Sequence, residues 1–182
     1  MYFEGYDGNG LAIMDRDGSN PRVLNKTRFA SVASATWHPG GDRIVVSAST
    51  TETTDLWILH VDGSPEQHIR VPGRAEVGPS WSPAGDRLAY LTSTDGQSFT
   101  LTVADADGAD ERELPGTYSD INPSWSPDGT RIAAEHDAGS VLRLTLIDPD
   151  GKAAPVVIEG VIPVESVASM RTSPTTWQRT AP

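Results

Sequence analysis

The chain has 182 residues, of which 14 are Lys or Arg and 25 are Asp or Glu, so its formal net charge is −11. This acidity argues against a protein that coats nucleic acid or binds anionic membranes, because phosphate groups would repel it. The absence of cysteine excludes disulfides and thiolate metal sites. No apolar run approaches the roughly 18 residues of a membrane-spanning helix, so membrane insertion is not expected.

Short strands are expected from the N-terminus onward. The first three are predicted over residues 1–4, 11–15 and 21–24. Later apolar stretches are also brief, are rich in β-branched or aromatic residues, and are bounded by turn-forming residues. Because no segment shows sustained helical periodicity, the chain is predicted to be all-β.

Two motifs repeat in step along the chain. Sequences of the form Trp-x-Pro-x-Gly-x-Arg begin at Trp37, Trp81 and Trp125, which are 81 − 37 = 44 and 125 − 81 = 44 residues apart. Turns that end in Asp-Gly recur with glycines at 18, 63, 108 and 151. Two motifs that share one period indicate a repeat architecture.

Each unit of about 44 residues is interpreted as four antiparallel strands, which is typical of a β-propeller blade. In the third complete unit the strands are expected over 122–126, 131–135, 141–148 and 155–159, with a Pro-x-Gly turn after the first and an Asp-Gly hairpin after the third. The recurring tryptophan is expected to pack between blades. The set is Trp37, Trp81, Trp125 and Trp177.

One propeller domain is therefore predicted over 1–182, with about four blades. Residues 1–35 supply three strands of a split blade, 36–79, 80–123 and 124–172 form blades, and 173–182 supply the closing strand of the split blade. Three arrangements remain open: four blades that close within one chain, a homodimer in which two chains exchange these ends to form eight blades, or part of a longer propeller.

The repeat, as in Pro79–Arg87 and Pro123–Arg131, resembles that of the TolB-type propellers, relatives of the WD-repeat proteins. The resemblance covers nearly the whole chain. It implies protein partners and an extracytoplasmic setting, periplasmic or at the envelope. Residues 1–5 do not form a secretory signal, so export would need a signal outside this sequence. Related blades also occur in serine peptidases and pectin-degrading lyases, but no catalytic residue carries over to this chain.

The candidate binding site is the mouth of the central channel. Residues five and six positions before each tryptophan vary between units while the scaffold stays constant, as expected of an adaptable binding surface. The candidates are Ser31, Glu76, Ser119, Asp120 and Arg171.

No catalytic motif or cofactor site is expected. The four histidines fall at different phases of the repeat, which argues against a histidine metal site. Calcium at the Asp-Gly turns is a weaker alternative to simple hairpin capping. The acidic side chains concerned are Asp105, Asp107, Asp110, Asp148 and Asp150.

The negative charge is concentrated in the second half of the chain. Residues 1–91 carry 8 basic and 11 acidic groups, whereas residues 92–182 carry 6 and 14. An acidic surface of this kind suits a basic partner.

The sequence thus favours a non-catalytic module that binds a protein or a small ligand. Alternatives are a carbohydrate-active lyase or hydrolase that uses channel carboxylates, and a half-ring that serves assembly.

Overall fold

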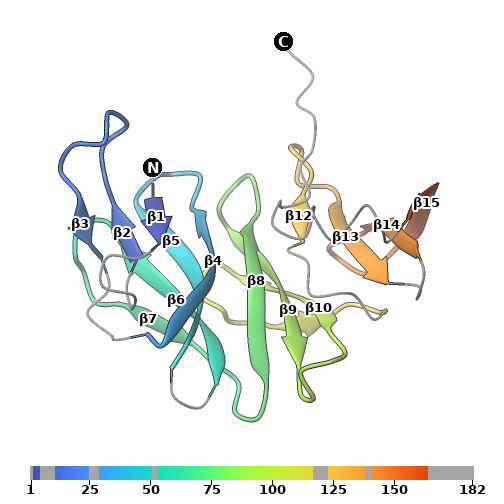
Figure 1. Ribbon diagram of the computed structural model, residues 1–182. Helices are drawn as coiled ribbons and strands as arrows, with labels where there is room; N and C mark the ends of the chain where they lie inside the picture. Colours follow the sequence, from blue (N-terminus) through green and yellow to red (C-terminus); the bar gives the residue numbers. More distant parts are fainter. Residues whose placement is uncertain are drawn as a thin grey trace.

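The computed structural model describes residues 2–4, 11–24, 29–50, 53–116, 123–137 and 141–163. These residues form four antiparallel sheets (Figure 1), three with four strands and one with three. The all-β prediction and the four-stranded repeat are confirmed. The described part of the chain contains no helix that is long and apolar enough to cross a membrane.

The first sheet contains β1 (Tyr2–Glu4), β2 (Leu11–Ile13) and β3 (Arg22–Val23), in that spatial order. These are three strands of the predicted split blade. The fourth strand of that blade, predicted over 173–182 with Trp177, lies outside the described residues.

The next three sheets follow the chain without crossovers. The second contains β4 (Ser31–Trp37), β5 (Arg43–Ser49), β6 (Thr54–His60) and β7 (Gln67–Ile69). The third contains β8 (Ala75–Trp81), β9 (Arg87–Ser93), β10 (Thr100–Asp105) and β11 (Arg112–Glu113). The fourth contains β12 (Ser124–Trp125), β13 (Ile132–Asp137), β14 (Val141–Ile147) and β15 (Val156–Pro163).

The tryptophan ends the first strand of its sheet. β4 and β8 start at Ser31 and Ala75, so the predicted blade boundaries at 36 and 80 fall inside these strands. The prediction placed the Trp motif at the beginning of a blade. In the structure a first strand of seven residues precedes the Pro-x-Gly turn, and the tryptophan is the last residue of that strand.

The apolar core consists of three layers, each between two neighbouring sheets. Leu11 and Ile13 pack with Ile44 and Val46, and Leu101 and Leu114 pack with Trp125 and Ile132. Between them, Leu56 and Ile69 of the second sheet pack with Trp81 and Tyr90 of the third. Burial of each such side chain contributes about 1.5 to 3 kcal/mol relative to its exposure. A single sheet therefore depends on its neighbours for stability.

The repeated turns have the conformations that their sequences predict. Gly41, Gly85 and Gly129 of the Trp-x-Pro-x-Gly turns have φ of 73°, 75° and 72°, a region that favours glycine. In three of the four Asp-Gly turns the aspartate before the glycine accepts a backbone hydrogen bond, as Asp107 does from the amide of Ala109 at 3.0 Å, whereas in the fourth turn the acceptor is Asp148. The hairpin interpretation of these turns is confirmed.

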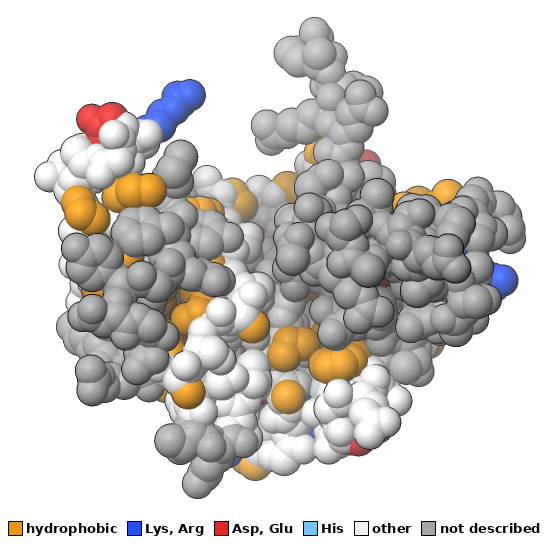
Figure 2. All heavy atoms as spheres, in the orientation of Figure 1, with side chains coloured by type: hydrophobic (Ala, Val, Ile, Leu, Met, Phe, Trp, Pro, Cys, Tyr) orange, Lys and Arg blue, Asp and Glu red, His pale blue; other side chains and the backbone are white. Residues whose placement is uncertain are grey.

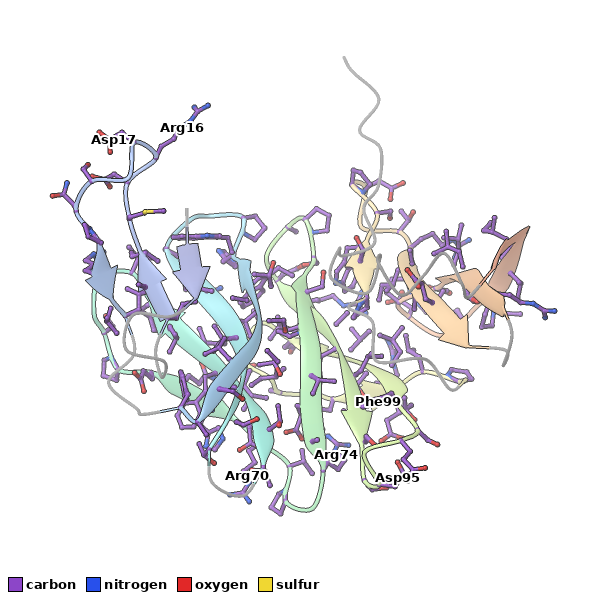
Figure 3. The ribbon with its side chains drawn as sticks, in the orientation of Figure 1. Arg16, Asp17, Arg70, Arg74, Asp95 and Phe99 are labelled. Carbon is purple, nitrogen blue, oxygen red and sulfur yellow. The ribbon has the colours of Figure 1, made fainter. Side chains whose placement is uncertain are left out.

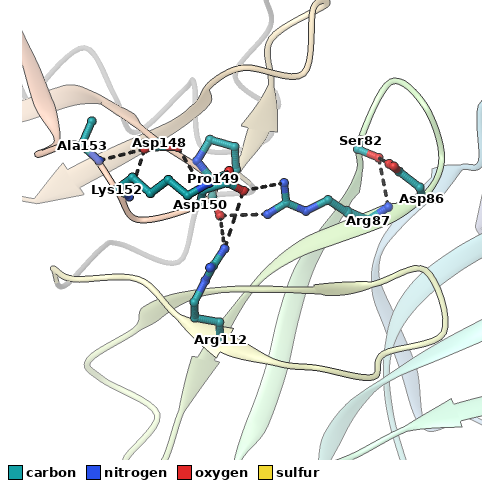
Figure 4. Close-up of polar contacts among 9 residues, drawn as sticks. All are labelled: Ser82, Asp86, Arg87, Arg112, Asp148, Pro149, Asp150, Lys152 and Ala153. Atoms are coloured by element: carbon teal, nitrogen blue, oxygen red, sulfur yellow. Dashed lines mark hydrogen bonds and ion pairs between the residues drawn. The ribbon is translucent and has the colours of Figure 1, made fainter.

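Polar contacts repeat between sheets as well. Cζ of Arg43 lies 5.2 Å from the ring centroid of Trp81, and Cζ of Arg87 lies 5.3 Å from that of Trp125. The indole Nε1 of Trp125 donates to the carbonyl of Ser80 at 3.1 Å. Arg87 also reaches the β14–β15 turn, where it binds the carbonyl of Pro149 and the carboxylate of Asp150 (Figure 4). The tryptophans at 81 and 125 thus pack between sheets, as predicted.

Replacement of Trp125 tests this packing. Trp125→Ala should lower the free energy of unfolding by about 3 to 5 kcal/mol, because it removes a large buried side chain that the core cannot refill. Urea denaturation measures the change, and Gln97→Ala in the exposed β9–β10 loop is the control. An unchanged midpoint for Trp125→Ala would contradict the inter-sheet role.

The first Trp motif carries histidine where the other two carry serine, which gives a second test. A Cβ at Gly85 would overlap the ring of His38, whereas a Cβ at Gly129 meets only Pro83 at 3.7 Å. Gly129→Ala should cost about 1 to 2 kcal/mol for the backbone alone, and Gly85→Ala about 1 to 3 kcal/mol more because of the overlap. In a His38→Ser background the difference between the two variants, measured by urea denaturation, should disappear. If it persists, the ring is not its cause.

Candidate functional site

An open pocket of about 450 Å³ lies where the loops of the second and third sheets meet. It is bounded by the β5–β6 loop, the β7–β8 loop and the β9–β10 loop. Figure 3 places the labelled residues of these loops, Arg70, Arg74 and Asp95, along the lower edge of the molecule, opposite the β2–β3 turn. We call this edge the loop face.

Seven of the ten residues that line the pocket have polar side chains. Its lining residues are Ser49, Thr50, Thr53, Thr54, Gly73, Arg74, Ala75, Ser93, Thr94 and Gly96. Six of these carry hydroxyl groups, which both donate and accept hydrogen bonds. The local sequence explains the shape, since Gly96 adopts a φ of 70° and turns the β9–β10 loop around the rim.

Arg74 is the charged group of the pocket, and it is held by three carboxylates. Its Nη2 lies 2.7 Å from Oε2 of Glu111, its Nη1 lies 3.3 Å from Oε1 of Glu113, and its Nε lies 3.7 Å from Oε1 of Glu76. Burial works against the charge of Arg74, but the hydrogen bond and the charge of Glu111 outweigh it and raise the Arg74 pKa. The guanidinium is therefore fixed in place and stays charged.

Tyr90 extends this network into the core. Its hydroxyl donates to Oε1 of Glu111 at 2.5 Å, and burial together with the Glu111 charge raises the Tyr90 pKa. Glu111 thus accepts hydrogen bonds from Arg74 and from Tyr90 through different oxygens. Because two groups orient it, Glu111 positions Arg74 at the pocket.

Glu76 lies directly behind the pocket and is completely buried, with 0% of its surface exposed. The backbone amide of Val71 donates to Oε1 at 3.2 Å, while Oε2 has no hydrogen-bond partner. Burial raises the pKa of Glu76 to about 7, and the nearby Arg74 offsets this only in part. The carboxylate does not reach the pocket surface, so a direct contact between Glu76 and a ligand, as its sequence position suggested, does not fit the structure.

The remaining predicted binding residues do not gather at the pocket in the part of the chain that the structure describes. Ser31 is exposed at the start of β4 and does not line the pocket. Ser119, Asp120 and Arg171 lie outside the described residues. The sequence reasoning missed Arg74 and the hydroxyl groups, although the Ser- and Thr-rich segments 47–54 and 92–94 are visible in the sequence.

A second polar cluster lies on β6 and β7. The buried carboxylate of Asp55 accepts from the hydroxyl of Thr53 and faces Nε2 of His68, both at 2.9 Å. The His68 ring stacks on Trp57 with 3.8 Å between centroids. His68 is therefore held between a carboxylate and an aromatic ring.

The weak calcium candidates lie in the hairpin turns. Asp148 accepts three backbone hydrogen bonds within its own turn, and Asp150 pairs with Arg87 and with Lys152. Asp105, Asp107 and Asp110 are exposed around the β10–β11 turn. Within the described ranges, no three His, Asp or Glu side chains are grouped so that they could hold a metal ion.

The unusual pKa of Glu76 predicts a pH-dependent stability. An ordinary Glu titrates near 4.5 and Glu76 near 7 in the folded protein, so between these values the folded state binds more protons than the unfolded state. Stability should therefore fall as pH rises through this window, by on the order of 2 to 3 kcal/mol. Glu76→Gln should remove that loss in urea denaturation at pH 5 and pH 8, and the exposed Glu113→Gln should retain it. Parallel pH profiles for wild type and Glu76→Gln would contradict the prediction.

Known proteins share this architecture. A family model described as the TolB beta propeller domain matches residues 7–162. No curated protein matches the chain.

Among solved structures, TolB from Acinetobacter baumannii is similar with a TM-score of 0.73 and 16% identity, over 88% of this chain and 41% of that one. A putative TolB from Agrobacterium tumefaciens has a TM-score of 0.67 and 21% identity, over 81% and 55%. An oligogalacturonate lyase in complex with manganese has a TM-score of 0.61 and 14% identity, over 79% and 40%. The chain thus spans about half or less of the length of these proteins, and at such identities the likeness shows the fold. Together with the match of the family model over most of its length, the fold shows that this chain belongs to the TolB β-propeller family.

Proposed function

We propose that this propeller is a non-catalytic binding module whose loop face receives a segment of a partner protein that carries a basic group. The observation that supports the proposal is the polar pocket around Arg74. Hydroxyl groups and exposed backbone of the loops suit the hydrogen-bonding groups of an extended peptide segment.

The charges around the pocket favour a basic ligand. Arg74 is opposed by Glu111 and Glu113, with the exposed Asp95 in the neighbouring loop. These three carboxylates exceed the two guanidinium groups of Arg74 and Arg70 on the loop face, and the whole chain has a net charge of −11. A lysine or arginine side chain would be attracted to this rim, and the attraction would weaken as salt screens it.

The enzymatic alternative, a lyase or hydrolase that uses channel carboxylates, gains support from the raised pKa of Glu76. Its full burial counts against this role, because a general acid or base must come within hydrogen-bond reach of the substrate. Glu111 is engaged by Arg74 and Tyr90. Binding therefore accounts for the arrangement better than catalysis does. We also propose that the module acts outside the cytoplasm, an expectation that its membership of the TolB β-propeller family supports.

A pocket-filling substitution tests the proposal. Labelled heptapeptides with a central Lys, Gln or Glu in otherwise identical sequences are titrated with the protein and followed by fluorescence anisotropy. The Lys peptides should bind best, and Thr94→Trp should weaken their binding about tenfold or more, equivalent to about 1.4 kcal/mol, because the indole occupies the pocket from an exposed position.

Ala109→Trp is the matched control, since it places the same indole on the exposed β10–β11 turn at the opposite edge and should leave binding unchanged. Equal binding of the three peptide types, or binding that is insensitive to Thr94→Trp, would reject the loop face as the binding site.

A further inference from the structure

The carboxylates around the pocket differ in how far their charge is already offset. Both oxygens of Glu111 are occupied, Oε2 by Arg74 at 2.7 Å and Oε1 by the hydroxyl of Tyr90. Glu113 lies 3.3 Å from the same guanidinium through its Oε1. Glu111 and Glu113 therefore share one positive charge and hold it in place.

The second arginine of the loop face is also paired. Nε of Arg70 lies 3.8 Å from Oδ2 of the buried Asp55. In Figure 3, Arg74 stands between Arg70 and Asp95 along the lower edge. Among the described residues, Asp95 forms no ion pair with either arginine or with any other basic group. Its charge is thus available to a ligand.

Asp95 is held by hydrogen bonds to only one of its two carboxylate oxygens. Oδ1 accepts from the backbone amides of Gln97 and Ser98, both at 2.8 Å, and from the hydroxyl of Ser93 at 3.0 Å. No hydrogen bond from the described part of the chain reaches Oδ2. The carboxylate therefore has one saturated oxygen, which fixes its orientation, and one oxygen that can accept from a ligand.

The place of Asp95 in the β9–β10 loop puts it at the pocket rim. It is exposed, and its neighbours Thr94 and Gly96 both line the pocket. Figure 2 shows acidic side-chain atoms at this lower edge of the molecule, surrounded mostly by uncharged atoms. A carboxylate that is already oriented loses little conformational freedom when it binds a cation.

The single available oxygen distinguishes between the two basic side chains. An arginine binds a carboxylate most strongly when its planar guanidinium reaches both oxygens at once. That contact would need Oδ1 of Asp95, which already accepts three hydrogen bonds. The ammonium of a lysine is a compact charge with three donors, so one donor can bind Oδ2 while the others reach hydroxyl groups of the pocket.

We propose that Asp95 selects the basic side chain of the partner, and that its Oδ2, as a single acceptor, favours the ammonium of a lysine over a guanidinium. This inference rests on the proposed function of the loop face. It names the group that the partner segment presents, a lysine, and the residue that recognises it.

Removal of one charge at a time tests the role of Asp95. The anisotropy titrations described above are repeated with a fourth peptide that has a central Arg. Asp95→Asn removes the charge but keeps an oxygen that accepts from the loop amides. The Lys peptide should bind this variant about fivefold more weakly, as for an ion pair near a surface, and binding of the Gln peptide should not change.

Glu113→Gln is the matched control. It removes the same charge from the same face, so any general weakening of the negative potential is present in both variants. Because Glu113 is engaged by Arg74, its replacement should weaken the Lys peptide by less than about twofold. For the wild type, the Arg peptide should bind no more tightly than the Lys peptide.

The pH profile separates Asp95 from Glu76. The hydrogen bonds from Ser98, Gln97 and Ser93 hold the pKa of Asp95 below its ordinary value, so Asp95 stays charged at pH 5. The ratio of Lys to Gln peptide affinities should therefore be the same at pH 5 and pH 8. A ratio that falls between pH 8 and pH 5 would overturn the proposal, because it would follow the titration of Glu76 near 7.

The remaining outcomes distinguish this proposal from the function on which it rests. If Thr94→Trp weakens binding but Asp95→Asn leaves the preference for Lys over Gln unchanged, the loop face stands as the binding site and Asp95 is not its selecting residue. Equal weakening of the Lys and Gln peptides by Asp95→Asn, or tighter binding of the Arg peptide to the wild type, also overturns the proposal. Binding that is insensitive to Thr94→Trp rejects the loop-face function and the role of Asp95 together.

Discussion

The structure depends on the packing of one apolar sheet face against the next. A four-stranded sheet of this size is apolar on both sides, so it is stable only when neighbours cover both faces. The second and third sheets have such neighbours, and their residues Val45, Val46, Leu91 and Leu101 are fully buried. The same rule explains why Val23, Val156 and Ile158, which are large, hydrophobic and exposed, are found in the first and last of the described sheets.

The repeated turns fix how one sheet meets the next. Tryptophan ends the first strand of each of the last three sheets, the Pro-x-Gly turn reverses the chain, and in two of these sheets the arginine that follows lies over the tryptophan of the following sheet. The hairpin turn of that sheet receives further polar contacts, as in the carbonyl of Pro149 bound by Arg87 and Arg112. A guanidinium over an indole adds about 0.5 to 2 kcal/mol at such a site, and the planar donors also set the relative orientation of the sheets.

The loop face differs from the edge that carries the Asp-Gly turns because its loops lack the repeated turn motifs. These loops carry hydroxyl groups, two arginines and several carboxylates, with Glu76 behind them. A completely buried carboxylate with a pKa near 7 is costly at neutral pH, and it lies beside the guanidinium that lines the pocket. Proteins of similar fold include both TolB proteins and a lyase, which agrees with the principle that function resides in the site and not in the fold.

The sequence by itself determined the fold class, the repeat, the strand order within each sheet and the turn chemistry. These features follow from local patterns: the 44-residue spacing of the tryptophans and the glycines that adopt positive φ. Only the tertiary structure decided the site. Glu76 was recognisable as a variable position before Trp81, but its burial results from packing against the second sheet, and the role of Arg74 depends on Glu111 and Glu113, which lie more than 35 residues away in the chain. Likewise, Leu114 is 2% exposed because the fourth sheet packs against it, whereas Ile158, on the corresponding face of the fourth sheet, is 40% exposed and has no other described sheet against it.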